Sequence, residues 1–178
     1  MESSGSSSTK ASPDVTRLGI LSDTHGRADS TAEGIKILRA AGAEFLIHCG
    51  DVGGENILDL LAGIPCTFVW GNCDFDRPLM AEYARGLGID CAGEMASLEM
   101  SGKRIAVTHG DDSKLLRQII EDEAGYDYLF VGHTHVAGEQ RNGKLRIVNP
   151  GALQRAARKT VALVDLKADT VRHIEVRP

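Results

Sequence analysis

Short apolar runs alternate with amphipathic stretches in the first half of the chain, and a polar segment follows each run. Residues 18–21 are apolar and stop at Ser22 and Asp23, a pattern typical of a buried strand that ends in a loop. The order of strand, polar loop and helix occurs three times, with predicted strands at 18–21, 45–47 and 66–70 and predicted helices at 30–41, 55–62 and 78–87. Three such units indicate parallel strands with helical crossovers, whose loops gather at the carboxyl ends of the strands, where ligands bind.

The second half of the chain has a different pattern, in which turn residues separate paired apolar runs. Ser101 and Gly102 separate the runs 96–100 and 104–108, which predicts a hairpin. Asn142 and Gly143 separate a second predicted pair of strands. The other predicted elements are a helix at 113–123, a strand at 128–131, the second hairpin's strands at 137–141 and 144–148, and closing strands at 160–166 and 170–176.

Length and composition fit one folded domain. The chain has 178 residues, of which 42% are hydrophobic, so it can bury a core. We expect a Ser-rich disordered tail at 1–16 and a single domain at 17–178. No apolar stretch approaches the roughly 20 residues that cross a bilayer, so we expect no membrane partner. The four cysteines form no Cys-x-x-Cys pair, which favours reduced thiols and a cytoplasmic location.

The charge balance argues against a nucleic-acid partner. Acidic residues outnumber basic ones by 25 to 20, which gives a net charge of −5, and the basic residues form no cluster. Because tight binding to phosphate backbones needs clustered Lys and Arg, we expect no stable nucleic-acid binding.

Residues that bind metal ions follow the predicted strands. His25 lies two positions after Asp23, and His133 and His135 have the same spacing, so each pair can direct two side chains into one small volume. The full set of candidate ligands at the strand ends is Asp23, His25, Asp51, Asn72, His109, His133 and His135. Imidazole, carboxylate and amide groups suit Mn, Fe, Zn, Co or Ni. Seven ligands are too many for one tetrahedral ion and fit two ions that share Asp51 as a bridge.

Each fragment alone has an ordinary interpretation. Gly-Asp and Gly-Asn pairs are common in turns, and an Asp-x-His segment can cap a loop. Their shared position directly after apolar strands is what favours a metal site. His48 lies inside the apolar run before Asp51, so we interpret it as a hydrogen-bonded core residue or a support for a ligand. His173 has no companion and is interpreted as structural.

Taken in order, the motifs resemble those of the calcineurin-like metallophosphoesterases. They are Ser22-Asp23-Thr24-His25-Gly26, Gly50-Asp51, Gly71-Asn72-Cys73-Asp74, Thr108-His109-Gly110 and Gly132-His133-Thr134-His135. The short chain and the segment Asn149-Pro150-Gly151 make it similar to the small YfcE-type branch. The resemblance implies an α/β fold, a four-layer α/β/β/α sandwich in which two packed mixed sheets are flanked by helices.

The resemblance also implies a reaction and a division of the ligands. It places Asp23, His25, Asp51 and His135 on one divalent ion and Asp51, Asn72, His109 and His133 on the other. We expect Mn, with Ni, Co, Zn or Fe as alternatives. The expected activity is that of a phosphodiesterase that hydrolyses a small phosphate ester by in-line attack of a metal-bridging hydroxide. Asp51, Asn72 and Cys73 are the candidate catalytic residues, and Asn72 and His109 the candidate substrate contacts.

Two positions depart from the family pattern. Cys73 stands where many members have a histidine that protonates the leaving oxygen. A neutral thiol is a poor acid for an alkoxide, so we expect a preference for leaving groups of low pKa. In the alternative, Cys73 only fills space and a water supplies the proton. Asp111 stands where the branch often has a histidine, and its charge lowers the positive potential near the substrate.

Other functions share this pattern. A phosphomonoesterase would use the same ligands, and the same fold serves as a subunit of the retromer coat, where it acts as a protein-interaction scaffold. A metal sensor is a third alternative, but the sequence shows no DNA-binding helix pair. All seven candidate ligands are intact, which favours the enzyme. The loops 75–80, 111–114 and 151–155 are expected to set the substrate, and the exposed edges of two sheets make a homo-oligomer plausible.

Overall fold

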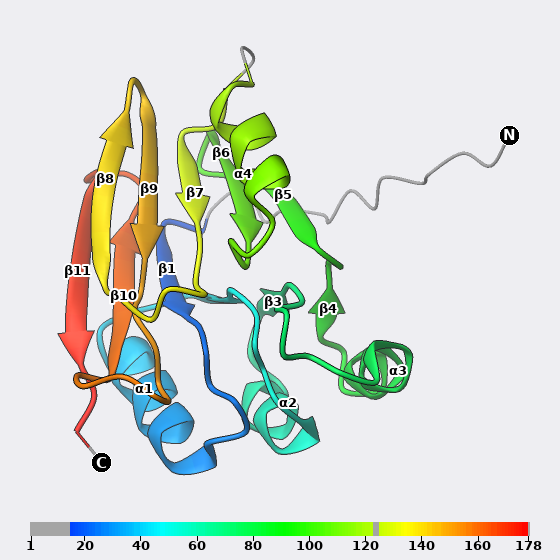
Figure 1. The fold of residues 1–178 in the computed structure, drawn as a ribbon. Coiled ribbons are helices and arrows are strands. Elements are labelled where there is room, and N and C mark those ends of the chain that lie inside the picture. The colour runs from blue at the N-terminus through cyan, green and yellow to red at the C-terminus, as the bar shows by residue number, and fades with distance from the viewer. Residues whose placement is uncertain (1–14, 123–124, 178) are drawn as a thin grey trace, which may run out of the picture.

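The computed structural model describes residues 15–122 and 125–177, so nearly all of the predicted tail lies outside the described residues. Two mixed sheets form the centre of the molecule (Figure 1). The first has the strand order β11-β10-β1-β2-β3-β4 and the second the order β5-β6-β7-β9-β8. No helix in the described ranges is both long and apolar enough to cross a membrane.

The first sheet contains the predicted parallel units. Its strands are β1 (Arg17–Leu21), β2 (Phe45–His48), β3 (Cys66–Phe68), β4 (Asp90–Cys91), β10 (Thr160–Asp165) and β11 (Thr170–Glu175). The first four run parallel, with Leu18 opposite Phe45 and Leu21 opposite His48. Strand β10 pairs antiparallel with β1, and β11 pairs antiparallel with β10. The helices that connect the parallel strands are α1 (Ala28–Ala40), α2 (Glu55–Leu61) and α3 (Arg77–Gly86).

The second sheet contains two hairpins around a parallel centre. Its elements are β5 (Met95–Met100), β6 (Lys103–Thr108), α4 (Ser113–Ile120), β7 (Tyr128–Phe130), β8 (Gly138–Asn142) and β9 (Leu145–Asn149). Strands β6, β7 and β9 are parallel, and β5 and β8 pair antiparallel at the edges. Asp112 caps α4, because its Oδ1 accepts hydrogen bonds from the N–H groups of Lys114 and Leu115 at 2.8 and 3.1 Å.

Three apolar clusters lie between the helices and the two sheets and pack them together. Alternate residues of β1 face opposite sides of its sheet: Leu21 packs with α1–α3 and Ile20 with the second sheet. On the far face of the second sheet, Ile119 of α4 packs against Leu129 and Ala106. Figure 1 shows α4 beside β6 and β7, and α1 and α2 on the side of the first sheet away from it. The predicted α/β sandwich with two packed mixed sheets is confirmed.

Most predicted boundaries lie within one or two residues of the observed ones, and the larger differences are the following. Strand β4 was not predicted, because two residues are too few to show a pattern. The strand expected at 66–70 ends at Phe68, and the helix expected at 113–123 ends at Ile120. The second hairpin turns at Gly143 and Lys144, since Asn142 still pairs with Leu145. The first hairpin turns at Ser101 and Gly102 as predicted, and both have the positive φ of a type I′ turn.

Candidate metal centre

The loops that leave β1, β2, β3, β6 and β7 meet at one end of the two sheets. Asp23 and His25 follow β1, Asp51 follows β2, and Asn72 lies beyond the end of β3. The second sheet supplies His109 after β6, and His133 and His135 after β7. The structure therefore brings all seven candidate ligands together, from segments as far apart in the chain as Asp23 and His135.

Close packing of glycine backbone allows these loops to meet. A Cβ at Gly71 would overlap the Asp51 carboxylate, and a Cβ at Gly132 would overlap Ser22 and approach Asp23 Oδ2. Gly50 has φ +93°, and a Cβ there would lie 2.8 Å from His109 Nδ1. Only glycine fits at these three positions without a shift of the neighbouring loop.

The backbone of the candidate ligands is itself unusual. Five of them occupy the left-handed region, with φ of 54°, 42°, 56°, 66° and 60° at Asp23, His25, Asp51, His133 and His135, respectively. A side chain in this region is strained, and such strain persists where the surrounding structure holds it and gathers at functional sites. Backbone hydrogen bonds supply that support: Asp23 N–H donates to Gly50 O and His25 N–H donates to Asp51 O.

The first half of the centre contains Asp23, His25, Asp51 and His135. His135 Nε2 lies 3.0 Å from Asp23 Oδ1, and His25 Nε2 lies 4.0 Å from the same oxygen. His25 Nε2 is also 3.6 Å from Asp51 Oδ2. His135 Nδ1 donates to the carbonyl of Arg155 at 3.4 Å, which orients the ring so that Nε2 faces the centre.

The second half contains Asp51, Asn72, His109 and His133. His109 Nε2 lies 3.4 Å from Asp51 Oδ2 and 3.1 Å from Asn72 Oδ1, and its Nδ1 donates to the Cys49 carbonyl at 2.8 Å. His133 Nδ1 approaches the same Asn72 oxygen at 3.1 Å. Asp51 Oδ2 thus faces a histidine of each half, while its Oδ1 accepts the Cys73 N–H at 2.8 Å.

Burial follows a gradient across the centre. Asp23, Asp51 and His109 are at most 3% exposed, whereas Asn72 and His133 are exposed. The carboxylates therefore lie at the bottom of the site, and Asn72 and His133 lie at its open side. A ligand from solvent meets the exposed pair first.

The donor atoms fit divalent metal ions. Asp23 Oδ1 and His25 Nε2 are buried, and neither has a hydrogen-bond partner among the described residues. An orphaned buried carboxylate oxygen is costly unless a cation or a donor satisfies it. Three groups of ligand atoms lie close enough for one ion: Asp23, His25 and His135; His25, Asp51 and Cys73; and Asp23, Asp51 and His109. The oxygen and nitrogen donors suit Mn, Fe, Co, Ni or Zn.

The ionisation of the centre follows from its contacts. Burial alone would raise the pKa of Asp51, but the hydrogen bonds from His109 and the Cys73 N–H hold this pKa well below its usual range. Burial lowers the pKa of His25 despite the nearby carboxylates, which keeps it neutral and able to bind a metal. Burial alone would lower the pKa of His109, but the hydrogen bonds to Asp51 and the Cys49 carbonyl outweigh this effect and raise the pKa to about 9.

Cys73 lies at the edge of the centre, with its sulfur within 4.8 Å of ligand atoms of His25 and Asp51. Burial and then the charge of Asp51 raise its pKa, so the thiol stays neutral and is a weak acid. Asp111, the second departure from the family pattern, is exposed on the loop that follows His109.

His48 supports two of the ligand loops. Gly50 N–H donates to its Nδ1 at 3.2 Å, so Nε2 carries the proton and donates to Thr24 Oγ1 at 2.9 Å. The Thr24 hydroxyl donates in turn to Val52 O at 2.8 Å. Burial lowers the pKa of His48 to about 3, so it is neutral. The interpretation of His48 as a hydrogen-bonded core residue is confirmed. His173 donates to Asn149 O at 2.8 Å, which agrees with its structural interpretation.

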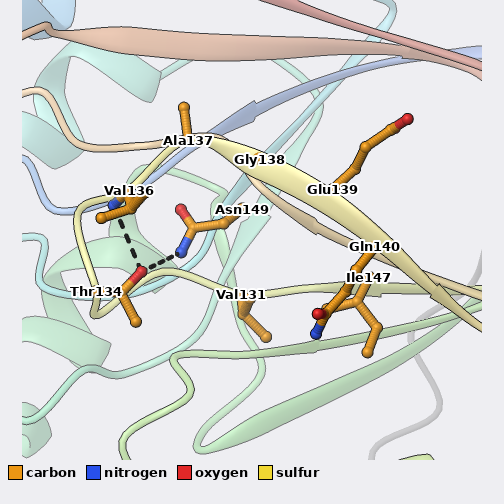
Figure 2. Close-up of a pocket in the computed structure, with 9 residues that line it drawn as sticks. All are labelled: Val131, Thr134, Val136, Ala137, Gly138, Glu139, Gln140, Ile147 and Asn149. Carbon is orange, nitrogen blue, oxygen red and sulfur yellow. Dashed lines mark hydrogen bonds between the residues drawn. The ribbon is translucent and has the colours of Figure 1, made fainter.

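Sequence reasoning assigned no role to Asp74 or Asn149, although both lie in the quoted motifs. Asp74 is buried and accepts hydrogen bonds from Gly71 N–H at 2.8 Å and Gly53 N–H at 3.0 Å, which ties two ligand loops together. Asn149 donates to Gly132 O and to Thr134 Oγ1 at 2.8 and 3.0 Å. Figure 2 shows Thr134 between Asn149 and the backbone of Val136, in the loop that carries His133 and His135. The only signal for Asp74 and Asn149 in the sequence was their presence in these motifs.

Two curated relatives cover most of the chain. The phosphodiesterase MJ0936 of Methanocaldococcus jannaschii is 28% identical over 140 residues, which are 76% of this chain and 82% of that protein. The probable metallophosphoesterase YsnB of Bacillus subtilis is 31% identical over 141 residues, which are 76% of this chain and 73% of that protein.

A solved structure and a family model extend the likeness. The structure described as a novel archaeal phosphodiesterase superposes with a TM-score of 0.83 at 23% identity and covers 90% of this chain and 99% of its own. This likeness supports the fold. The model of the calcineurin-like phosphoesterase superfamily domain matches residues 16–169, a range that contains every candidate ligand. The chain therefore belongs to the calcineurin-like phosphoesterase superfamily.

Proposed function

We propose that the chain is a binuclear metal-dependent phosphodiesterase that hydrolyses a small phosphate ester. The observation that carries the proposal is the position of Asp51. One of its oxygens, Oδ2, faces His25 at 3.6 Å and His109 at 3.4 Å, and the other candidate ligands lie on either side of it. A carboxylate that faces two sets of ligands suits a bridge between two ions.

Seven side chains would hold the two ions. We assign Asp23, His25, Asp51 and His135 to one ion and Asp51, Asn72, His109 and His133 to the other, with Mn as the first choice of metal. When bound, the ions activate a water as the nucleophile and stabilise the charge on the phosphoryl oxygens. His109 is 1% exposed and both of its nitrogens have partners, which favours metal binding over substrate contact for this residue.

The open side of the centre would position the phosphate. Asn72 is exposed there, and its Oδ1 is held by two histidines, so its amide N–H groups point elsewhere and can donate to a phosphoryl oxygen. Asn72 Nδ2 lies 3.5 Å from the sulfur of Cys73, which places the thiol beside the same region.

Cys73 bears on the choice between aryl and alkyl leaving groups. Its raised pKa makes it a poor proton donor to a leaving alkoxide. An aryloxide of low pKa leaves without a proton, so aryl esters are favoured over alkyl esters. An ester with an alkyl leaving group would need another acid, and solvent water at the exposed Asn72 side is the alternative.

Hydrolysis of two chromogenic esters tests the proposal. Bis(p-nitrophenyl) phosphate and p-nitrophenyl phosphate are supplied to the metal-free chain and to the chain loaded with Mn, Ni, Co, Zn or Mg. We expect turnover that depends on metal, favours the diester and is lost in Asp51→Asn. Asp59→Asn is the matched control, because Asp59 is exposed on α2 and its side chain accepts a hydrogen bond from Tyr83, away from the candidate centre.

A measurement of bound metal separates the alternatives. Two ions per chain together with turnover support the enzyme. Two ions per chain with no turnover of either ester under any metal would contradict it and favour the protein-interaction scaffold. Loss of turnover in both Asp51→Asn and Asp59→Asn would mean that the site is misplaced.

A further inference from the structure

A cavity of about 870 Å³ opens beside the predicted metal centre, and His135 belongs to both. The loop 134–137 forms one wall, the segment 155–160 another, and the end of β11 a third. This volume lies in the range of small-molecule sites. The cavity therefore offers room for the part of a substrate that extends away from the metal ions. A smaller cavity of about 330 Å³ lies near Asn149 and Val136 (Figure 2), and His135 does not line it.

Four polar side chains of the larger cavity already have partners within the protein. Thr160 Oγ1 donates to Pro150 O at 2.7 Å, and His173 Nε2 donates to Asn149 O at 2.8 Å. Thr134 Oγ1 accepts from Asn149 Nδ2 at 3.0 Å. The carboxylate of Glu175 accepts from Arg177 at 3.2 Å, and the charge of Arg158 also acts on this carboxylate. None of these groups needs a ligand.

Arg155 and Arg158 differ from these four side chains, because no hydrogen-bond or ion-pair partner for either guanidinium is seen among the described residues. Within residues 15–122 and 125–177, neither guanidinium makes a hydrogen bond or an ion pair, and both side chains are exposed. Arg155 is held in the left-handed region at φ 55°, with its carbonyl bonded to His135. Its charge contributes to the lowering of the pKa of His25, so the guanidinium acts on the metal centre from the cavity. The strained backbone and the bond to His135 place this arginine beside the ligands.

We propose that this cavity is a second anion subsite, in which Arg155 and Arg158 bind a phosphate group of the substrate other than the one that is cleaved. The inference rests on the proposed function and names its substrate class, a diester that carries an additional phosphate monoester. Guanidinium groups match phosphate oxygens in a bidentate geometry. Two guanidinium groups balance the charge of about −2 on a phosphate monoester, whereas a single guanidinium would balance a carboxylate.

Binding to the metal-free full-length chain tests the subsite without any hydrolysis. The probe is inorganic pyrophosphate, followed by calorimetry after a circular dichroism check that each variant is folded. We expect the double variant Arg155→Gln/Arg158→Gln to raise the Kd for pyrophosphate by about tenfold or more, since each substitution removes charge-assisted hydrogen bonds to the ligand. Arg172→Gln is the matched control, because Arg172 is exposed on β11 and does not line the cavity. Equal Kd values for the double variant and the wild type, or equal weakening by Arg172→Gln, would overturn the subsite.

A pair of substrates tests it in the metal-loaded chain. Thymidine 5′-(p-nitrophenyl phosphate) is compared with the same ester that carries a 3′-phosphate. We expect the wild type to have the higher kcat/KM for the 3′-phosphorylated ester, and we expect the ratio to fall toward one in the double variant. A ratio that the double variant leaves unchanged would contradict the subsite. Failure to hydrolyse both esters under any metal contradicts the proposed function, whereas the pyrophosphate result decides the subsite independently.

Discussion

The two halves of the metal centre differ in how the protein satisfies their polar atoms. In the half that contains Asp23 and His25, Asp23 Oδ1 and His25 Nε2 are buried and have no hydrogen-bond partner among the described residues. In the other half, Asn72 Oδ1 accepts from both His109 and His133. In the first half, two buried polar atoms are left for a bound cation to satisfy, with His135 Nε2 close to Asp23 Oδ1, at 3.0 Å. In the second half, hydrogen bonds within the protein already satisfy the shared oxygen of Asn72. The two parts of the candidate centre therefore differ in how far the protein alone organises them.

The largest expected effect comes from the residue that joins the halves. Asp51→Asn removes the charge that faces both His25 and His109, so neither ion keeps its ligand set. We expect turnover of the aryl diester to fall on the order of 10³-fold, because several kcal/mol of charge stabilisation are lost. Steady-state rates with each metal measure the effect. Retention of more than a tenth of the activity would show that the halves work independently.

The support beneath the first half should respond to pH. The pKa of His48 is about 3 in the folded chain and 6.5 in the unfolded one, so between these values only the unfolded chain binds the proton. The free energy of unfolding is therefore fully retained above pH 6.5 and decreases as the pH falls toward 3, by up to about 1.4 kcal/mol per pH unit.

Denaturant unfolding of His48→Gln between pH 7 and pH 4 measures this contribution. Glutamine can donate to Thr24 and accept from Gly50 without a titrating group. We expect a shallower decrease in the variant than in the wild type. The same slope in both proteins would show that His48 does not titrate on unfolding.

The second half contains the departure from the family pattern. Cys73→His places a better acid beside Asn72, so we expect turnover of alkyl monoesters to rise about tenfold relative to aryl diesters. Cys73→Ser is the control, because it keeps the small size and adds no stronger acid. An unchanged ratio in Cys73→His would favour the alternative in which water protonates the leaving group.

The smallest expected effect bears directly on the difference between the halves. In the metal-free chain at pH 8, Asp23→Asn removes a buried charge whose Oδ1 lacks a hydrogen bond, so the free energy of unfolding should rise by about 1 kcal/mol. Asn72→Ala removes the acceptor shared by two histidines and should lower it by about 1 kcal/mol. Thermal unfolding of both variants measures the signs. A change of the free energy of unfolding in the same direction for both variants would contradict the difference between the two halves.

The sequence predicted most of the elements because its strands and helices carry clear periodic patterns, whereas the sandwich of two packed sheets was implied by the family resemblance. Strand β4 was not predicted, because its two residues, Asp90 and Cys91, are too few to show a periodic pattern. The candidate ligands could be named because each opens a loop directly after an apolar strand. The family resemblance placed Asp51 between the two sets of ligands, but the distances around it could not be predicted, since they depend on where loops from two sheets meet. The supports Asp74 and Asn149 bond to backbone groups of other segments, and no local pattern marks such bonds.

The left-handed backbone of the ligand loops has a consequence for protein engineering. Asp23, His25, Asp51, His133 and His135 hold conformations that suit glycine better, at an energetic cost of about 1 kcal/mol or more each. A sequence redesigned for stability alone would target these five positions along with the other left-handed ones, such as Asp76 and Asp169. Because these five are candidate metal ligands, an optimised variant of this protein must hold them fixed.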